Sequence, residues 1–446
     1  MFTTIALFII SAACFPAEFV ALDAGGLTWT MERLWLLVLV IQLALSWHQG
    51  RLIPMRFELS DVAIILFLAW LFVRTVTQPL GSVVPEQPAT LMHFVNGYLI
   101  PIGLYFVLRH SRLDKEDLKP VYWLWMALGL YLGATAILEI AKVWSLVFPS
   151  FIADPTLGIH FGRARGPMLQ SVRLGMCLLS CITPLLVFSV WLKPNDRLRW
   201  VGVGVMLPLL WAAVFFTYTR SIWMGLIAVT GMLIVFCLQG TPRRAIIFLM
   251  VTAVAVGGAI KGPSLIAFKR EYSEAETRES TYMRAAMLYV SLEMFKDRPL
   301  AGYGFNQFQV YNGPYLAYRS TNIRLESIRG YVHHNSFLSL LVDLGLVGFA
   351  LYMFVLGSLC VQSWAVWRAN VPQWVRGLSL SALAICAVHT IQMAFHEVSF
   401  SAIENSMLYA AFGLSIAAKQ QFCFRAQRAG TQTSVSDIGR HASFAR

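Results

Sequence analysis

The chain has 446 residues, of which 57% are hydrophobic and 13% are charged, and its mean hydropathy is +0.63. A soluble multidomain protein of this length would be more polar, so the composition excludes that class and indicates a polytopic membrane protein. The formal net charge of +12 does not indicate a nucleic-acid partner, because most of the basic residues lie in short loops where membrane topology accounts for them.

Apolar runs that are long enough to cross a hydrocarbon core of about 30 Å recur along the chain. They predict an all-α protein with about twelve transmembrane helices. No basic segment and no small-residue cleavage site accompany the first run, so we expect it to be retained as a helix. The runs cover residues 2–21, 31–47, 59–77, 91–108, 120–140, 168–192, 198–217, 221–238, 244–261, 335–358, 375–395 and 402–418.

The short loops alternate between basic ones and loops without Lys or Arg, such as 22–30, 79–90 and 396–401. Basic loops favour the cytoplasm, so we expect both termini to be cytoplasmic. We therefore divide the chain into four segments. Residues 1–262 contain nine transmembrane helices, residues 263–332 form a large outward loop, residues 333–418 contain three more helices, and residues 419–446 form a disordered cytoplasmic tail.

Three arginines surround the predicted start of the sixth helix on the outward side: Arg163, Arg165 and Arg173. The topological bias disfavours basic residues there, so they need a separate cause. They could form a cationic lip that binds a substrate, or they could anchor the helix to lipid phosphates.

Arg220 lies between two apolar runs with almost no loop between them. A guanidinium at the edge of the membrane costs several kcal/mol unless it meets a partner, which makes Arg220 a candidate functional residue. The alternative is an interfacial arginine beside Tyr218 and Trp223 that extends toward water.

The large outward loop is expected to contain an amphipathic helix over 265–296, ended by Pro299 and Gly302. Arg278 and Arg284 lie on this helix, where they could bind a substrate or simply form a solvated face. At the end of the loop, His333 and His334 directly precede the next apolar run.

Several arginines and an imidazole, without a cluster of carboxylates, favour an anionic substrate whose leaving group is already good. A diphosphate ester fits, because arginines stabilise the departing charge and a neutral histidine accepts the proton of an attacking hydroxyl. We therefore expect neither a metal nor another cofactor. The outward residues His396 and Glu397 are weaker candidates for a supporting role or an alternative base.

Three segments carry a resemblance to the O-antigen ligase and Wzy-type polymerase superfamily of bacterial envelope enzymes. Thr219-Arg220-Ser221 resembles its Ser/Thr-Arg signature, and residues 294–304 after Arg284 are similar to its D-x-P-L-x-G-x-G stretch. His334-Asn335-Ser336-Phe337-Leu338 and residues 344–348 resemble its His-Asn segment and the following helix. The similarity covers about residues 200–348, and the order and spacing of the segments agree with the family.

The resemblance implies a GT-C-like glycosyltransferase of the bacterial inner membrane with its active site in the periplasm. Arg220 and Arg284 would hold the diphosphate of an undecaprenyl-diphosphate-linked glycan, and His334 would activate the acceptor hydroxyl for inverting attack. The remaining substrate-binding candidates are Arg163, Arg165, Arg173, Arg278 and His333.

The resemblance leaves the acceptor open. A ligase would use lipid A-core, which we favour; a polymerase would use a second lipid-linked glycan, and a third branch of the family would glycosylate a protein hydroxyl.

Outside the family, a lipid-linked glycan transporter is disfavoured because no repeat of 1–217 is visible in 218–446. A non-enzymatic assembly protein would have Arg220, Arg284 and His334 on unrelated surfaces.

Overall fold

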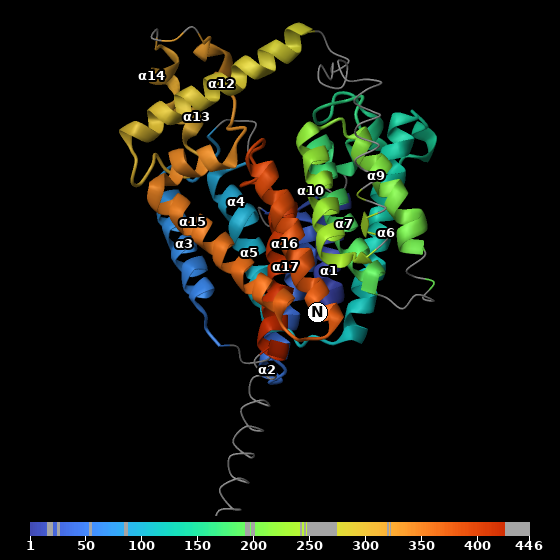
Figure 1. Cartoon of the computed structure of the whole chain (residues 1–446). Helices are drawn as coiled ribbons and strands as arrows, with labels where there is room; N and C mark the ends of the chain where they lie inside the picture. Colours follow the sequence, from blue (N-terminus) through green and yellow to red (C-terminus); the bar gives the residue numbers. More distant parts are fainter. Residues whose placement is uncertain are drawn as a thin grey trace, which may run out of the picture.

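Long helices form a bundle, and a smaller group of helices projects from one end of it, which we call the loop end (Figure 1). The projecting group contains α12 (Glu274–Asp297), α13 (Phe308–Tyr311) and α14 (Gly313–Leu316). The protein is seen in a computed structural model, which describes residues 1–15, 21–24, 27–52, 56–83, 88–191, 201–240, 274–318 and 323–423, with isolated positions at 197, 243, 244, 247 and 321.

Eight of the described helical segments are long and apolar enough to cross a membrane. They are α2 (Met31–His48), α3 (Leu59–Val76), the continuous α4, η1 and α5 (Thr90–Phe94, Val95–Leu99 and Ile100–Arg109), α6 (Lys115–Ile140), α7 (Ser171–Trp191), α10 (Arg220–Cys237), α15 (Ser336–Arg368) and α16 (Gln373–Met393). Three shorter helices occupy further predicted positions: α1 (Phe2–Cys14), α9 (Leu207–Phe216) and α17 (Ala402–Ala418). The predicted run 244–261 lies almost entirely outside the described residues, so the count of twelve stays a prediction.

The N-terminal region differs from the prediction. Helix α1 ends at Cys14 and does not extend to residue 21. A proline cannot donate the backbone hydrogen bond that a continuing helix needs, and Pro16 follows closely. Beyond it, β1 (Ala21–Ala24) pairs antiparallel with β2 (Leu27–Thr30), where we expected the end of a span and a loop.

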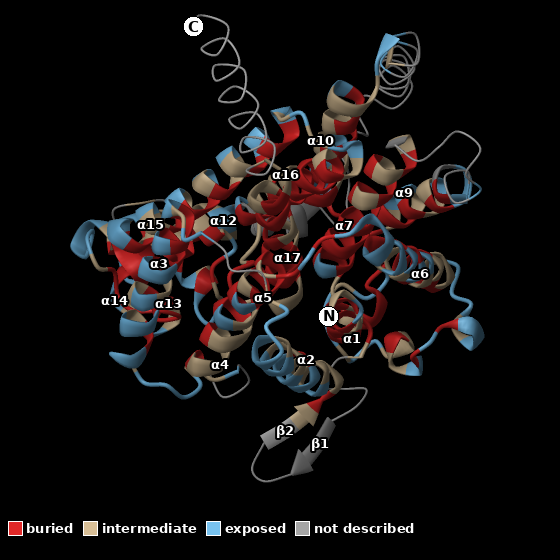
Figure 2. Ribbon diagram, turned by 90° about the horizontal axis from the view of Figure 1, so that it is seen from below, coloured by how far each residue is buried: buried red, intermediate tan, exposed pale blue. Residues whose placement is uncertain are grey.

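The centre of the bundle is formed by α7, α16 and α17, which are mostly buried in Figure 2, whereas α2 is mostly exposed. In the apolar stretch of α7, 78% of the residues are buried, against 6% in α2. An apolar helix surface that meets no protein is typical of contact with lipid. The mostly helical architecture and the apolar helices together indicate a multi-pass membrane protein.

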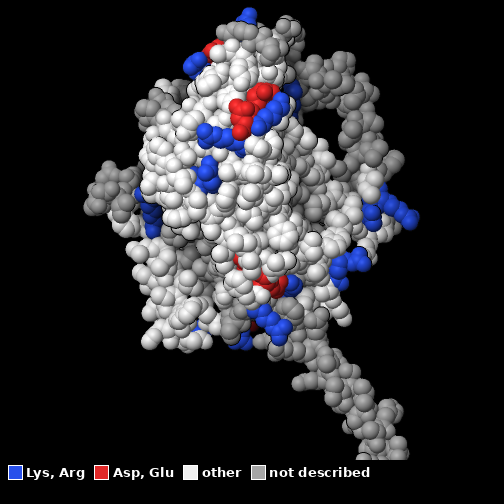
Figure 3. All heavy atoms as spheres, turned by 90° about the vertical axis from the view of Figure 1, so that its left-hand side faces the viewer, with Lys and Arg blue, Asp and Glu red and all other residues white. Residues whose placement is uncertain are grey.

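Charged residues lie at the end of the bundle opposite the loop end. Lys419 forms an ion pair with Glu58 at 2.6 Å and a hydrogen bond with Gln362 at 2.9 Å. Gln362 follows the start of α15 by about 26 residues, or about 39 Å of helix, so this group is far from the loop end. Figure 3 shows charged side chains over the large loop and near the opposite end, with a largely uncharged surface between them.

The segment 299–306 attaches the large loop to a kink in α15, and we call this arrangement the clasp. The N–H groups of Tyr303 and Gly304 donate to the carbonyls of Val342 and Asp343 at 2.8 and 2.9 Å. In return, the N–H of Leu346 donates to the carbonyl of Pro299 at 2.7 Å. The kink lies at Gly345, whose φ of 67° interrupts the helix and opens its backbone to these bonds.

Candidate functional site

Arg220 is the first residue of α10, directly after a very tight turn from α9. Tyr218 in this turn has a φ of 45°, and Thr219 is extended, which lets the chain reverse within three residues. The side chain of Arg220 is exposed. The turn therefore holds a guanidinium at the start of an apolar helix, as the sequence predicted.

Helices α7 and α10 are joined at their N-termini beside Arg220. The hydroxyl of Thr219 donates to the carbonyl of Thr217 at 3.0 Å and also lies 3.4 Å from the hydroxyl of Ser171, the first residue of α7. Ser171 in turn shares a hydrogen bond of 3.0 Å with Nδ1 of His160. These contacts fix one side of the Thr219-Arg220-Ser221 segment.

On its other side, the segment is joined to the loop between α16 and α17. The hydroxyl of Ser221 shares a hydrogen bond of 2.9 Å with Nε2 of His396. The side-chain amide of Gln392 donates to the carbonyl of Ser221 at 2.8 Å. Arg220 is thus flanked by two residues whose side chains are held by distant parts of the chain.

The start of α15 meets the same loop. Asn335 caps the helix by accepting from the N–H of Leu338 at 3.0 Å, and its amide donates to the carbonyl of Ala394 at 3.0 Å. The hydroxyl of Ser336 donates to the carbonyl of His396 at 2.9 Å. Ser336 lies two residues after His334, and its partner His396 also bonds to Ser221. The chain around His334 and the chain around Arg220 are therefore held by the same loop.

Arg284 completes the group from the large loop, since its charge acts on two of these imidazoles. His334 keeps an exposed surface, but partial loss of hydration lowers its pKa, and the positive charge of Arg284 lowers it further. Burial lowers the pKa of His396 to about 3, and the charges of Arg284, His334 and His160 contribute. His160, His334 and His396 therefore lie close to one another or to Arg284. The imidazoles of His334 and His396, whose pKa values are lowered, favour the neutral form at neutral pH.

The two neighbouring histidines have different surroundings. His333 is buried, with its ring centre 3.9 Å from that of Phe308 and its Nδ1 sharing a hydrogen bond of 3.4 Å with Ser291 of α12. His334 is exposed. This arrangement favours a supporting role for His333 in the large loop and leaves His334 as the imidazole that faces the site.

The arginines before α7 also divide into different groups. Arg165 is fully buried and forms an ion pair with Glu139 at 3.3 Å. Its guanidinium also donates to the carbonyls of Leu157 and Ile152 at 2.7 and 2.8 Å. Because its donors are directed to the protein, Arg165 is better suited to hold residues 150–166 in place than to contact a substrate.

The remaining predicted arginines vary in exposure. Arg163 is largely buried, whereas Arg173, in the first turn of α7, is exposed and acts electrostatically on His93. Arg278 lies on α12, but its side chain is outside the described residues. Of the four arginines outside the proposed catalytic set, Arg173 is the one whose described exposure fits direct contact with an anion.

Three long helices begin at this site: α7, α10 and α15. Their N-termini are linked by the bonds of Thr219 and Ser171 and by the two contacts of His396. Each helix N-terminus carries a partial positive charge and unpaired N–H groups, and the exposed guanidiniums of Arg173, Arg220 and Arg284 add full charges. The arrangement favours a multiply charged anion next to a neutral imidazole.

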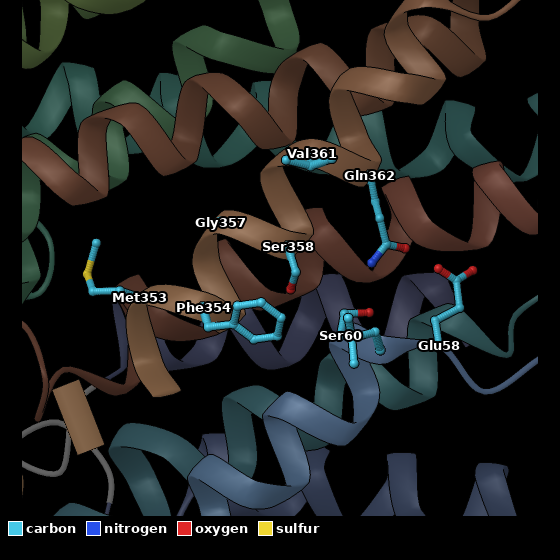
Figure 4. A pocket seen from close by; sticks show the side chains of 9 residues that line it. Glu58, Ser60, Met353, Phe354, Gly357, Ser358, Val361 and Gln362 are labelled. Atoms are coloured by element: carbon cyan, nitrogen blue, oxygen red, sulfur yellow. The ribbon is translucent and has the colours of Figure 1, made fainter. Parts of the chain in front are cut away.

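A separate groove of about 520 Å³ lies far from this site, between the start of α3 and the second half of α15 (Figure 4). Two of its polar residues, Glu58 and Gln362, belong to the end of the bundle opposite the loop end. The groove therefore has no part in the chemistry of the cationic site. It is lined by Glu58, Leu59, Ser60, Met353, Phe354, Gly357, Ser358, Val361 and Gln362.

We expected only a weaker role for His396 from the sequence, and we did not predict His160 or Ser171 as members of the site. His396 and His160 both lie in segments that connect helices and have no topological reason for an imidazole, which is a weak signal. The D-x-P-L-x-G-x-G stretch belongs to the clasp, where its backbone bonds to α15.

Comparison with known proteins agrees with the resemblance. Residues 205–353 match a family model described as O-antigen ligase. The matched range includes Arg220, Arg284, His334 and the clasp. No curated protein matches the chain.

Proposed function

Because residues 205–353 form a domain of the O-antigen ligase family, we propose that this protein transfers a glycan from undecaprenyl diphosphate to a hydroxyl acceptor at the loop end. The observation that carries the proposal is the junction through His396, which brings the Arg220 and His334 segments together beneath Arg284. The reaction would take place at the periplasmic face of the bacterial inner membrane.

In the proposed reaction, the acceptor oxygen attacks the anomeric carbon while the bond from that carbon to the diphosphate oxygen breaks. His334 accepts the proton of the attacking hydroxyl, which requires the neutral imidazole. Arg220 and Arg284 stabilise the charge that develops on the departing diphosphate. Attack from the face opposite the leaving group inverts the anomeric configuration, and no metal is needed because the arginines supply the positive charge.

Lipid A-core is the acceptor that we favour, which would make the protein a ligase. The same cationic site would also serve a polymerase, because both reactions use the same donor and a hydroxyl nucleophile. The acceptor is selected by surfaces outside the cationic site, so an assay of products must distinguish the two.

The test is glycan transfer in a deletion strain that carries the wild-type gene, His334→Ala or Arg220→Lys. Loss of capped lipopolysaccharide with accumulation of long undecaprenyl-linked polymer would identify a ligase. Accumulation of single repeat units would identify a polymerase. Arg220→Lys should restore transfer only in part, because lysine lacks the planar fork that binds two phosphate oxygens. Unchanged products in His334→Ala would contradict the proposed function.

A further inference from the structure

The two residues next to Arg220, Thr219 and Ser221, both carry hydroxyl groups. Each hydroxyl is connected, directly or through one other side chain, to an imidazole from another part of the chain. Thr219 reaches His160 through Ser171, with distances of 3.4 and 3.0 Å. Ser221 reaches His396 directly at 2.9 Å, and the two residues are 175 positions apart in the sequence. Such long-range contacts on both sides of an exposed arginine restrict where its backbone can lie.

His396 differs from His160 because it also contacts the helix that follows the proposed base. Its carbonyl accepts the hydroxyl of Ser336 at 2.9 Å, and that same hydroxyl accepts the N–H of Val398 at 2.8 Å. Ser336 lies two residues after His334. One residue therefore bonds through its side chain to the Arg220 segment and through its backbone to the His334 segment.

We propose that His396 is a positioning residue that sets the distance between Arg220 and His334 through its bonds to Ser221 and Ser336. His160 and Ser171 brace the other side of Arg220. The inference rests on the proposed transfer function, because the distance matters only if the diphosphate and the acceptor hydroxyl react between these two side chains. A reacting geometry that shifts by about 1 Å can lower a rate by about 100-fold.

A histidine suits this position for an electrostatic reason. The site already contains the positive charges of Arg220 and Arg284, which would repel an additional positive charge. A neutral imidazole bonds to the Ser221 hydroxyl without adding charge, and burial holds the pKa of His396 at about 3. Lysine or arginine could reach the same hydroxyl only by adding a positive charge.

The contacts also separate His396 from the proposed base. Its Nε2 is engaged by Ser221 and its backbone by Ser336, so the residue is tied to two helix starts. His334 is exposed at the same site. We therefore assign proton transfer to His334 and positioning to His396.

The test measures binding of undecaprenyl diphosphate to the purified full-length protein, together with transfer in the deletion strain. The variants are His396→Ala, His396→Gln, Ser221→Ala and the double variant Ser221→Ala/His396→Ala. His110→Ala is the matched control, because His110 bonds to the carbonyl of Phe106 within its own turn of the chain. Its ring does not belong to the site.

We expect His396→Ala and Ser221→Ala each to weaken binding of undecaprenyl diphosphate by about tenfold, because the guanidinium of Arg220 is then no longer held in the position that contacts the diphosphate. The double variant should be no weaker than either single variant, because both remove the same bond. His396→Gln should recover most of the binding, since its amide can reach the position of Nε2 and stays neutral. Melting temperatures should lie within a few degrees of that of His110→Ala, because one hydrogen bond contributes only about 0.5–1.5 kcal/mol to stability.

Two results would overturn the inference. Additive losses in the double variant would mean that the Ser221–His396 bond does not carry the effect. Unchanged binding in His396→Ala, with transfer abolished and the acid limb of the pH profile lost, would make His396 the base itself. Failure of the proposed function looks different, because His334→Ala would then transfer as well as wild type.

Discussion

The carbonyl of Leu300 lies where a Cβ on Gly345 would have to be placed. Gly345 has a φ of 67° at the kink of α15, and the N–H of the nearby Val347 donates to this same carbonyl at 3.3 Å. The large loop therefore approaches α15 closely only because this residue lacks a side chain. The contact joins the loop that carries Arg284 to the helix that follows His334.

Gly345→Ala should loosen the clasp. The added methyl collides with the Leu300 backbone, and a non-glycine residue at this φ costs about 1–3 kcal/mol. We expect a lower melting temperature and faster proteolysis within 274–318. Gly357→Ala is the control on the same helix, because nothing lies within 4 Å of a Cβ added there. Equal melting temperatures of the two variants would contradict this role of Gly345.

Arg165→Ala should destabilise the fold more than it affects substrate binding. The substitution removes the ionic partner of the buried carboxylate of Glu139 and leaves it only the backbone N–H groups of residues 165 and 166, and breaking a buried ion pair costs up to about 3–5 kcal/mol. Thermal unfolding in lipid nanodiscs measures the change, with the exposed Arg173→Ala as the control for stability. Stability equal to that of wild type, combined with weaker binding of undecaprenyl diphosphate, would return Arg165 to the substrate-binding set.

Substitutions of the two neighbouring histidines should have different effects. His334→Ala should lower transfer by about 100- to 10,000-fold, the usual contribution of a general base, and leave the melting temperature unchanged because the side chain is exposed. His333→Ala should lower the melting temperature, because its ring packs against Phe308. Measurements of transfer and melting on both variants decide the matter, and the reverse pattern would exchange the roles of the two residues.

Arg284→Gln should move the acid limb of the transfer rate to higher pH. The positive charge of Arg284 lowers the pKa of His334, so its removal raises that pKa. His334 then becomes protonated, and inactive as a base, at a higher pH than in wild type. The pH profile of the residual rate tests this independently of the overall loss of activity. A limb that stays in place or moves to lower pH would contradict the assigned contact.

Acid should weaken the packing of the large loop through His333. Its pKa is about 3 in the folded protein and near 6.5 when unfolded, so the unfolded state binds the additional proton between these values. The contribution of His333 to the free energy of unfolding is therefore fully present above pH 6.5. It falls by up to about 1.4 kcal/mol per pH unit as the pH drops toward 3. Proteolysis of the loop as a function of pH should show this slope in wild type and a shallower one in His333→Gln.

The sequence by itself determined where the apolar helices lie, because hydropathy is a property of neighbouring residues. The predicted runs at 59–77, 221–238, 375–395 and 402–418 agree with α3, α10, α16 and α17 within one or two residues. It also identified the large loop and the motif residues Arg220, Arg284 and His334, whose types alone indicate an anionic substrate. The proposed catalytic roles of these residues stay predictions.

Only the tertiary structure decided which groups meet. Ser221 and His396 are 175 residues apart, and no local pattern shows that the turn before α10 contacts the loop after α16. The burial of Arg165 against Glu139 and the different environments of His333 and His334 also depend on packing between distant segments. Local sequence sets which segments become helices, but the partner of a polar side chain is chosen when those helices pack, because burial makes an unpaired polar group costly.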